Sequence, residues 1–235
     1  MTIRNWIKFF IMCMTIGGLV TAVAGTIIRW NFFYPYLAAG EIGEFIAAFT
    51  WMIVLGFTMS VIAQAGFFGY LTLHQVGVGI FRSLTLWNWV QLLLIFVVLG
   101  DLIIFRFAPN AESAMDWLFY GGLLVFLVFA AIATAIKKVK LTEKKHILIP
   151  SIFFMIVVTS LEWLIALMGR QDNIDTYIAL LLFPLVAVNA FQLLALPKYN
   201  QKSEEDRKKL EERRKQRKEQ EALSKKNKNR KSSKA

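Results

Sequence analysis

The chain has 235 residues, of which 57% are hydrophobic and 18% are charged, and its formal net charge at pH 7 is +11. Soluble domains contain about 45–50% apolar and about 25% charged residues. The composition excludes a mainly disordered chain, which would be poor in apolar and aromatic residues. The single cysteine, Cys13, excludes a fold held together by disulfides.

The positive charge is concentrated at the C-terminal end. Residues 197–235 hold 16 of the 27 Lys and Arg and 7 of the 16 Asp and Glu, a net charge of +9. The first 196 residues carry the remaining +2 and most of the apolar residues. This division is typical of a membrane protein with a basic tail.

Six segments are long and apolar enough to cross a bilayer as helices, which takes about 20 residues. The fourth segment is apolar on every side, whereas a helix of a soluble protein has a polar face. We therefore predict an all-α, polytopic membrane protein whose residues 1–198 form a six-helix bundle. The predicted spans cover about 7–28, 45–70, 86–105, 117–136, 147–168 and 177–196.

Lys and Arg in short loops indicate the orientation, because they are retained on the cytoplasmic side. They gather in the N-terminal segment, in the second and fourth loops and in the tail. The other loops carry one arginine each: Arg29, Arg106 and Arg170. Both termini are therefore predicted to lie in the cytoplasm, and an even number of spans agrees with this because it requires both termini on one side. The chain is expected in the cell membrane.

Polar side chains inside the spans fall into two layers. Near the cytoplasmic ends, three spans carry amides that lie on shared helix faces: Gln64, Asn88, Gln91, Asn189 and Gln192. These amides are expected either to join helices by hydrogen bonds or to line a small polar cavity.

The second layer is charged and lies towards the outer ends. Glu162 is the only ionisable residue well inside a predicted span, and Asp101 lies near the end of the third span. A buried acid is expected to pair with a cation, for which Arg29 and Arg106 are candidates, or to be protonated. Such an acid marks either a structural ion pair or a path for protons or ions.

The sequence offers no catalytic signature. It has two histidines, no HExxH, no cluster of Cys and His at metal-binding spacing, and no glycine-rich phosphate loop. We predict that the protein is not an enzyme and uses no cofactor or metal ion.

The second loop is unusual because residues 64–91 combine four glycines with aromatic and apolar residues. A plain cytoplasmic loop would be polar. This segment is expected to lie in the membrane interface or to form a partner-contact loop. The polar residues of that candidate surface are Gln64, His74, Arg82, Asn88 and Gln91.

The tail, residues 199–235, is predicted to be helical in part and then disordered. Ser203 and Asp206 fit a capping box that would start a helix reaching about Leu223. The basic residues are expected to stay in solvent or to contact anionic lipid. A nucleic acid is not favoured as partner, because no aromatic residue lies among the charges.

Three segments resemble a known family. They are RNWIKFF at Arg4–Phe10, QAGFFGYLTLH at Gln64–His74 and GIFRSLTLWNWVQ at Gly79–Gln91. Together with the six-span layout, they resemble the KinB-signalling pathway activation (KbaA) proteins of spore-forming Gram-positive bacteria. The resemblance covers about residues 1–198. It implies a membrane regulator of sporulation that acts on a membrane sensor histidine kinase, and it supplies no catalytic residues.

Two functions are therefore compared. In the first, the bundle packs against the spans of the kinase and favours one of its signalling states. In the alternative, the chain is a small transporter or ligand-sensing channel that uses Glu162 and Asp101 as its ion or proton site.

Overall fold

The structure is a computed structural model that describes residues 2–168 and 174–232. Helices account for nearly all of these residues, and no strand occurs among them. The chain divides into a bundle unit, residues 10–195, and a terminal unit, which comprises residues 1–9 and 196–235. Each unit is described by itself.

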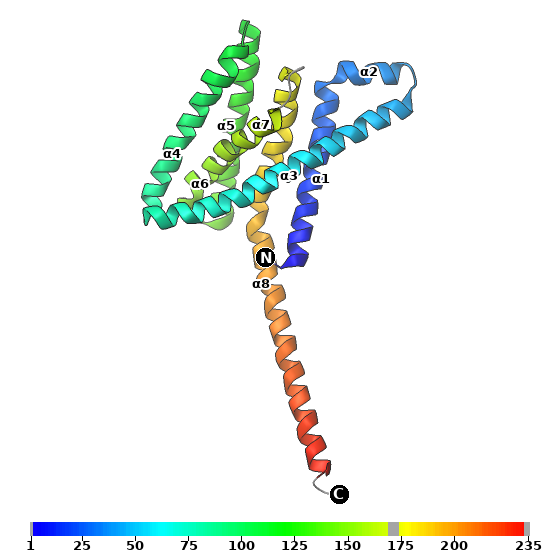
Figure 1. Cartoon of the computed structure of the whole chain (residues 1–235), viewed down its shortest axis with the longest axis vertical. Helices are drawn as coiled ribbons and strands as arrows, with labels where there is room; N and C mark the ends of the chain where they lie inside the picture. The colour runs from blue at the N-terminus through cyan, green and yellow to red at the C-terminus, as the bar shows by residue number, and fades with distance from the viewer. Residues whose placement is uncertain (1, 169–173, 233–235) are drawn as a thin grey trace. The chain divides into compact units, whose positions relative to one another are not determined.

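The helices of the described residues follow one another along the chain, and the first turns of α1 and the C-terminal part of α8 belong to the terminal unit (Figure 1). They are α1 (Ile3–Ile28), α2 (Trp30–Ala38), α3 (Ile42–Phe81), α4 (Leu84–Asp101), the π-helix η1 (Leu102–Phe107), the 3-10 turn η2 (Ala108–Asn110), α5 (Ala114–Thr142), the 3-10 turn η3 (Lys145–Ile147), α6 (Leu148–Phe153), the π-helix η4 (Phe154–Val158), α7 (Thr159–Leu167) and α8 (Ile174–Ser232).

Six helical stretches of the described chain are long and apolar enough to span a membrane, which is the number predicted. The fifth stretch consists of α6, η4 and α7, and 67% of its apolar window is buried, against 22–33% for the first four. A high buried fraction in an apolar helix means that other helices, rather than lipid, surround most of it. The fifth span is therefore a central helix of the bundle.

The connection between the second and third spans differs from the predicted loop. Helix α3 continues for 40 residues to Phe81, and α4 begins at Leu84. Arg82, with a positive φ of 50°, ends α3, and the hydroxyl of Ser83 accepts from the backbone N–H of Leu86 to cap α4. Residues 64–91 thus form a helical corner. A helix of this length is about 60 Å long, twice the hydrocarbon thickness of a bilayer.

Helices α1 and α3 cross with their backbones in contact. A Cβ atom on Gly56 would lie 2.7 Å from the Cα of Gly18, and a Cβ on Gly17 would lie 2.8 Å from the carbonyl oxygen of Gly56. The Ser60 hydroxyl donates to the carbonyl of Cys13 at 3.1 Å across the same crossing. Small residues allow such close approach of helices in membranes, where apolar burial alone gives little driving force.

The terminal unit joins the first turns of α1 to the charged part of α8. Arg4 makes an ion pair with Asp206, in which its Nη2 donates to both carboxylate oxygens at 2.9 Å. Asn5 is fully buried and donates to Ser203 at 3.1 Å and to Asp206 at 2.9 Å. The ring of Phe9 meets that of Tyr199 edge-on at 5.3 Å.

The predicted helix start at Ser203 is wrong, because α8 runs without interruption from Ile174 to Ser232. The Ser203 hydroxyl donates to the carbonyl of Tyr199 at 2.7 Å, as a serine within a helix does. Ser203 and Asp206 are three residues apart and lie on one face of α8, where both accept hydrogen bonds from Asn5. The helix also extends past Leu223, into the segment expected to be disordered.

Candidate functional site

Among its described residues, the bundle unit buries twelve polar or charged side chains. Each of the following is at most 8% exposed: Thr21, Ser60, Gln64, Gln91, Thr134, Lys138, Ser151, Thr159, Ser160, Glu162, Asn189 and Gln192. Polar groups are costly in hydrocarbon and usually face the interior of a bundle. The amide layer predicted from the sequence is buried here, except for Asn88, which is partly exposed.

Glu162 lies at the centre of this set, on α7. One of its oxygens, Oε2, accepts a 2.6 Å hydrogen bond from the side-chain amide of Asn189 on α8. The same amide donates to the hydroxyl of Thr159 at 2.9 Å, so a single Asn189 holds two side chains one turn apart. These bonds fasten the fifth and sixth spans to each other.

The second carboxyl oxygen of Glu162 lies against Gly66 of α3. A Cβ atom at position 66 would collide with Oε1 and would lie 2.8 Å from Cδ. A side chain at this point would occupy the space of the carboxyl group and displace it. Three helices therefore meet at Glu162.

Several atoms of this polar centre have no hydrogen-bond partner among the described residues. They are Oε1 of Glu162, Oδ1 of Asn189, Oγ of Ser160 and both polar atoms of the Gln64 amide. Buried polar groups are nearly always satisfied, and each exception calls for a physical explanation. The centre has free hydrogen-bonding capacity within the bundle.

A π-helical stretch precedes the polar centre. The helix widens at η4, immediately before Thr159, and all five residues of this stretch are buried. A π-bulge turns the following residues relative to those before it, and such bulges are frequent at functional sites. The bulge therefore sets the face on which Thr159 and Glu162 meet α8.

The arginines considered as partners of Glu162 lie elsewhere. The guanidinium of Arg29 lies over the ring of Phe32, 4.5 Å from its centroid, and Arg106 belongs to η1. In the described chain no salt bridge involves Glu162, whose partner is the amide of Asn189. Asp101 ends α4 with its side chain exposed, so the structure does not bring it together with Glu162.

The helical corner is held by Trp87. Its indole N–H donates to Nδ1 of His74 at 3.1 Å, and its ring stacks on Phe81 with centroids 5.5 Å apart. Gly77 leaves room for the ring, since a Cβ there would lie 2.5 Å from it. Arg82 is exposed at the tip of the corner.

The five residues of the candidate partner-contact loop thus divide into two groups. Gln64 and Gln91 are buried within the bundle unit, and Gln91 lies beside Tyr70, whose hydroxyl donates to the carbonyl of Pro150. Arg82 is exposed, while His74 and Asn88 are partly exposed, and Asn88 donates to the carbonyl of His146 at 3.5 Å. Only the second group can contribute to a surface.

Lys138 is a buried cation that the sequence did not single out. It belongs to the basic residues near the predicted fourth loop, but its side chain is only 8% exposed and its ammonium group donates to the carbonyl of Leu193. A lysine within a run of lysines gives no signal of burial. Its position follows only from the packing of α5 beside α8.

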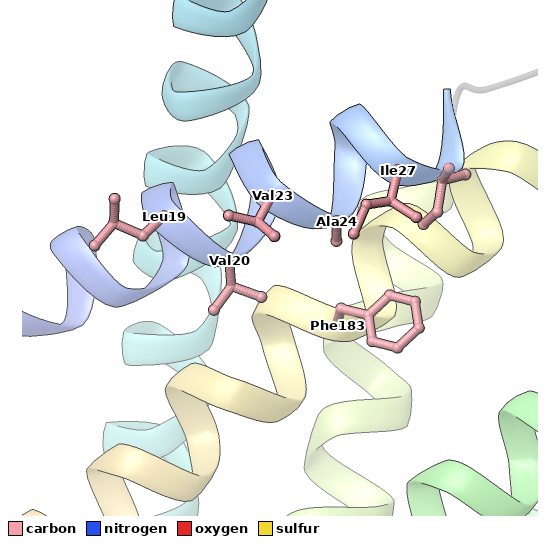
Figure 2. A pocket seen from close by; sticks show the side chains of 7 residues that line it. Leu19, Val20, Val23, Ala24, Ile27 and Phe183 are labelled. Carbon is pink, nitrogen blue, oxygen red and sulfur yellow. The ribbon is translucent and has the colours of Figure 1, made fainter. Parts of the chain in front are cut away.

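The bundle also has a wholly apolar groove of about 480 Å³ between α1 and α8. Its labelled side chains lie around the opening, with Val20, Val23 and Ile27 on α1 and Phe183 on α8 (Figure 2). It offers no polar group that would select a ligand, so lipid chains or apolar side chains can fill it. No group of three or more His, Cys, Asp or Glu that could hold a metal ion occurs among the described residues.

Residues 17–199 match the family model described as KbaA, KinB-signalling pathway activation in sporulation. The chain belongs to the KbaA family. It is also 39% identical over 199 residues to the KinB-signaling pathway activation protein of Bacillus subtilis (strain 168), a match that covers 85% of this chain and 98% of that protein. No solved structure matches the chain.

The KbaA match includes the polar centre and the helical corner. Glu162, Asn189 and Gly66 lie within residues 17–199, as do Gly77 and Trp87. The Arg4–Asp206 ion pair lies outside that range on both sides, and so does the charged part of α8 beyond residue 199. The family model therefore covers most of the bundle unit and little of the terminal unit.

Proposed function

We propose that this protein is a non-enzymatic integral membrane regulator that activates a KinB-type sensor histidine kinase, and thereby the phosphorelay that leads to sporulation. The observation that carries the proposal is membership of the KbaA family over residues 17–199. The name of the Bacillus subtilis relative supports the same role. The protein resides in the cell membrane with both termini in the cytoplasm.

The helix surfaces of the bundle unit support a role in binding another membrane protein. Large apolar side chains of α4 are exposed along its length, among them Trp89, Leu93 and Phe96, at 63–66%. Such a surface contacts either lipid chains or the spans of a partner. A regulator of this kind must bind one signalling state of the kinase more tightly than the other, since only differential affinity shifts an equilibrium.

The buried polar centre also supports the proposed regulatory role, because it can act as a structural element of the bundle. A membrane bundle gains specific helix pairing from interhelical hydrogen bonds. The Glu162–Asn189 bond fixes α7 against α8, and the contact with Gly66 fixes α3 against both. A partner that binds to these helices therefore contacts them in one fixed relative arrangement.

The test is reconstitution of the kinase with and without this protein in lipid vesicles. We expect the two proteins to co-purify from membranes and the rate of kinase autophosphorylation to rise when this protein is present. A kinase that autophosphorylates at the same rate in both preparations would contradict the proposal.

A second candidate, a small transporter or channel, is favoured by one observation. Oε1 of Glu162 is buried without a partner, as an ion- or proton-binding oxygen would be. Asp101 does not lie with it, because its side chain is exposed at the end of α4. A Glu162→Gln variant separates the two functions: a transporter loses pH-dependent flux in vesicles, whereas the regulator keeps kinase activation if its fold is retained.

A further inference from the structure

Two hollows of the bundle unit meet at Arg29. One is a groove of about 420 Å³ between α3 and α7, and the other is a smaller hollow of about 260 Å³ at the turn from α1 to α2. Arg29 and Tyr177 line both. Volumes of this size lie within or near the range of ligand sites in proteins.

The groove is mainly apolar, and the polar groups among its lining side chains belong to Arg29, Thr58 and Tyr177. Its walls come from α3 between Trp51 and Ile62 and from α7 and its end between Ile165 and Met168. The eleven helical steps from Trp51 to Ile62 correspond to a length of about 16 Å along α3. A mainly apolar groove of this length fits an acyl chain.

The smaller hollow is polar. Besides Arg29 and Tyr177 it is lined by Asn31 and Thr176, which add an amide and a hydroxyl group. The Arg29 guanidinium is held in place by the face of Phe32, at 4.5 Å from the ring centroid. Within the described residues this cation takes part in no salt bridge.

We infer that the two hollows form one binding site for an anionic membrane lipid, with its acyl chain along α3 and its phosphate at Arg29. An arginine fork with neighbouring hydroxyl and amide groups is well suited to phosphate oxygens. Charge complementarity identifies the class of lipid, because a neutral zwitterionic head group would bring a second cation next to Arg29. This inference goes beyond the proposed function and does not depend on it.

The site is tested by native mass spectrometry of the full-length protein in detergent. The probes are phosphatidylglycerol, phosphatidylcholine of the same chain length, and glycerol phosphate, which has the anionic group without the chains. We expect one phosphatidylglycerol to bind about tenfold more tightly than phosphatidylcholine, a ratio typical of one charge-assisted contact. Glycerol phosphate is expected not to bind at the same concentrations.

Two variants address the two halves of the site. Arg29→Gln should reduce the preference for phosphatidylglycerol to below about threefold, and Arg29→Lys should keep most of it. Ile62→Trp should block the groove and weaken both lipids. Lys137→Gln, an exposed cation on α5, and Val61→Trp, an exposed neighbour outside the groove, are the matched controls and should behave as the unmodified protein.

Three outcomes would overturn the inference. One is equal binding of the two phospholipids, which would mean that only non-selective lipid contact occurs. Another is binding of glycerol phosphate as tight as that of phosphatidylglycerol, which would mean a site for a free anion. The third is that neither Arg29→Gln nor Ile62→Trp differs from its control.

Discussion

Glu162 shows which parts of the site depend on tertiary packing. Its burial is predictable, since it is an acid within a long apolar segment. The spacing of Asn189 and Gln192 also predicts that they share a helix face. The pairing of Glu162 with Asn189 was not predictable, because the sequence does not specify that α7 lies beside α8 in this register.

Gly66 gives a direct test of the polar centre. A Gly66→Ala substitution places a methyl group on the Glu162 carboxyl, and we expect a loss of about 1–3 kcal/mol in the free energy of unfolding in detergent. Gly69→Ala is the control, because a Cβ at that position has open space around it. Equal stability of the two variants would show that Glu162 does not lie against α3.

Asp206 gives a prediction about pH. Burial acts to raise the pKa of Asp206, but hydrogen bonds from Arg4 and Asn5 and the Arg4 charge outweigh it and leave that pKa below its usual value. The contribution of this group to stability is therefore complete above the unfolded-state pKa of about 3.9 and is lost as the pH falls through the lower folded-state value.

The N-terminal segment should accordingly become mobile in acid. A nitroxide spin label on an Ile3→Cys variant, at an 80% exposed position, reports this mobility. We expect an immobilised label at pH 7, with mobility that begins to rise as the pH falls below the usual Asp pKa and is complete only below the lowered pKa of Asp206. Adding Asp206→Asn should make the label mobile already at pH 7. An immobilised label at pH 7 in Asp206→Asn would contradict the assignment.

At the scale of elements, the number of spans was predictable and the length of α3 was not. Long apolar stretches specify spanning helices almost by composition alone. The four glycines of residues 64–91 suggested a loop, since glycine weakens helices in water. In membrane helices glycine is tolerated and often marks close packing. Gly77 marks such a contact. At Gly69 and Gly79, by contrast, an added Cβ atom would lie in open space.

The helical corner provides the test at this scale. Gly77→Ala would push a methyl group into the ring of Trp87 and should loosen the contact of Trp87 with His74 and Phe81. The corner carries the exposed Arg82, at which trypsin can cleave. We expect faster cleavage after Arg82 in Gly77→Ala than in the unmodified protein, and no change in Gly79→Ala. Equal rates in both variants would show that the Trp87 packing does not hold the corner.

At the scale of the whole molecule, the charge of the chain reflects two separate features. Most of the +11 belongs to residues 197–235, of which those up to Ser232 form the charged part of α8, and the rest belongs to the first 196 residues. The KbaA match ends at residue 199, so the charged part of α8 lies outside the matched range. No motif in the sequence indicates a function by its chemistry, and the proposed function rests on membership of the KbaA family.

The proposed topology can be measured with single cysteines in a Cys13→Ser background. A membrane-impermeant thiol reagent should label Glu41→Cys and Asn110→Cys in intact cells, because both positions lie in loops predicted to be outside. Lys144→Cys and Gln220→Cys should react only after permeabilisation. The reverse pattern would mean that both termini lie outside the cell.

The central claim, activation of a KinB-type kinase pathway, is tested most directly by cross-complementation. The gene for the 39% identical relative is deleted in Bacillus subtilis cells whose only input to the sporulation phosphorelay is KinB, and this chain is expressed in its place. We predict that the deletion lowers the frequency of heat-resistant spores and that this chain restores it. A chain that reaches the membrane in normal amounts and leaves spore formation at the level of the deletion would contradict the claim.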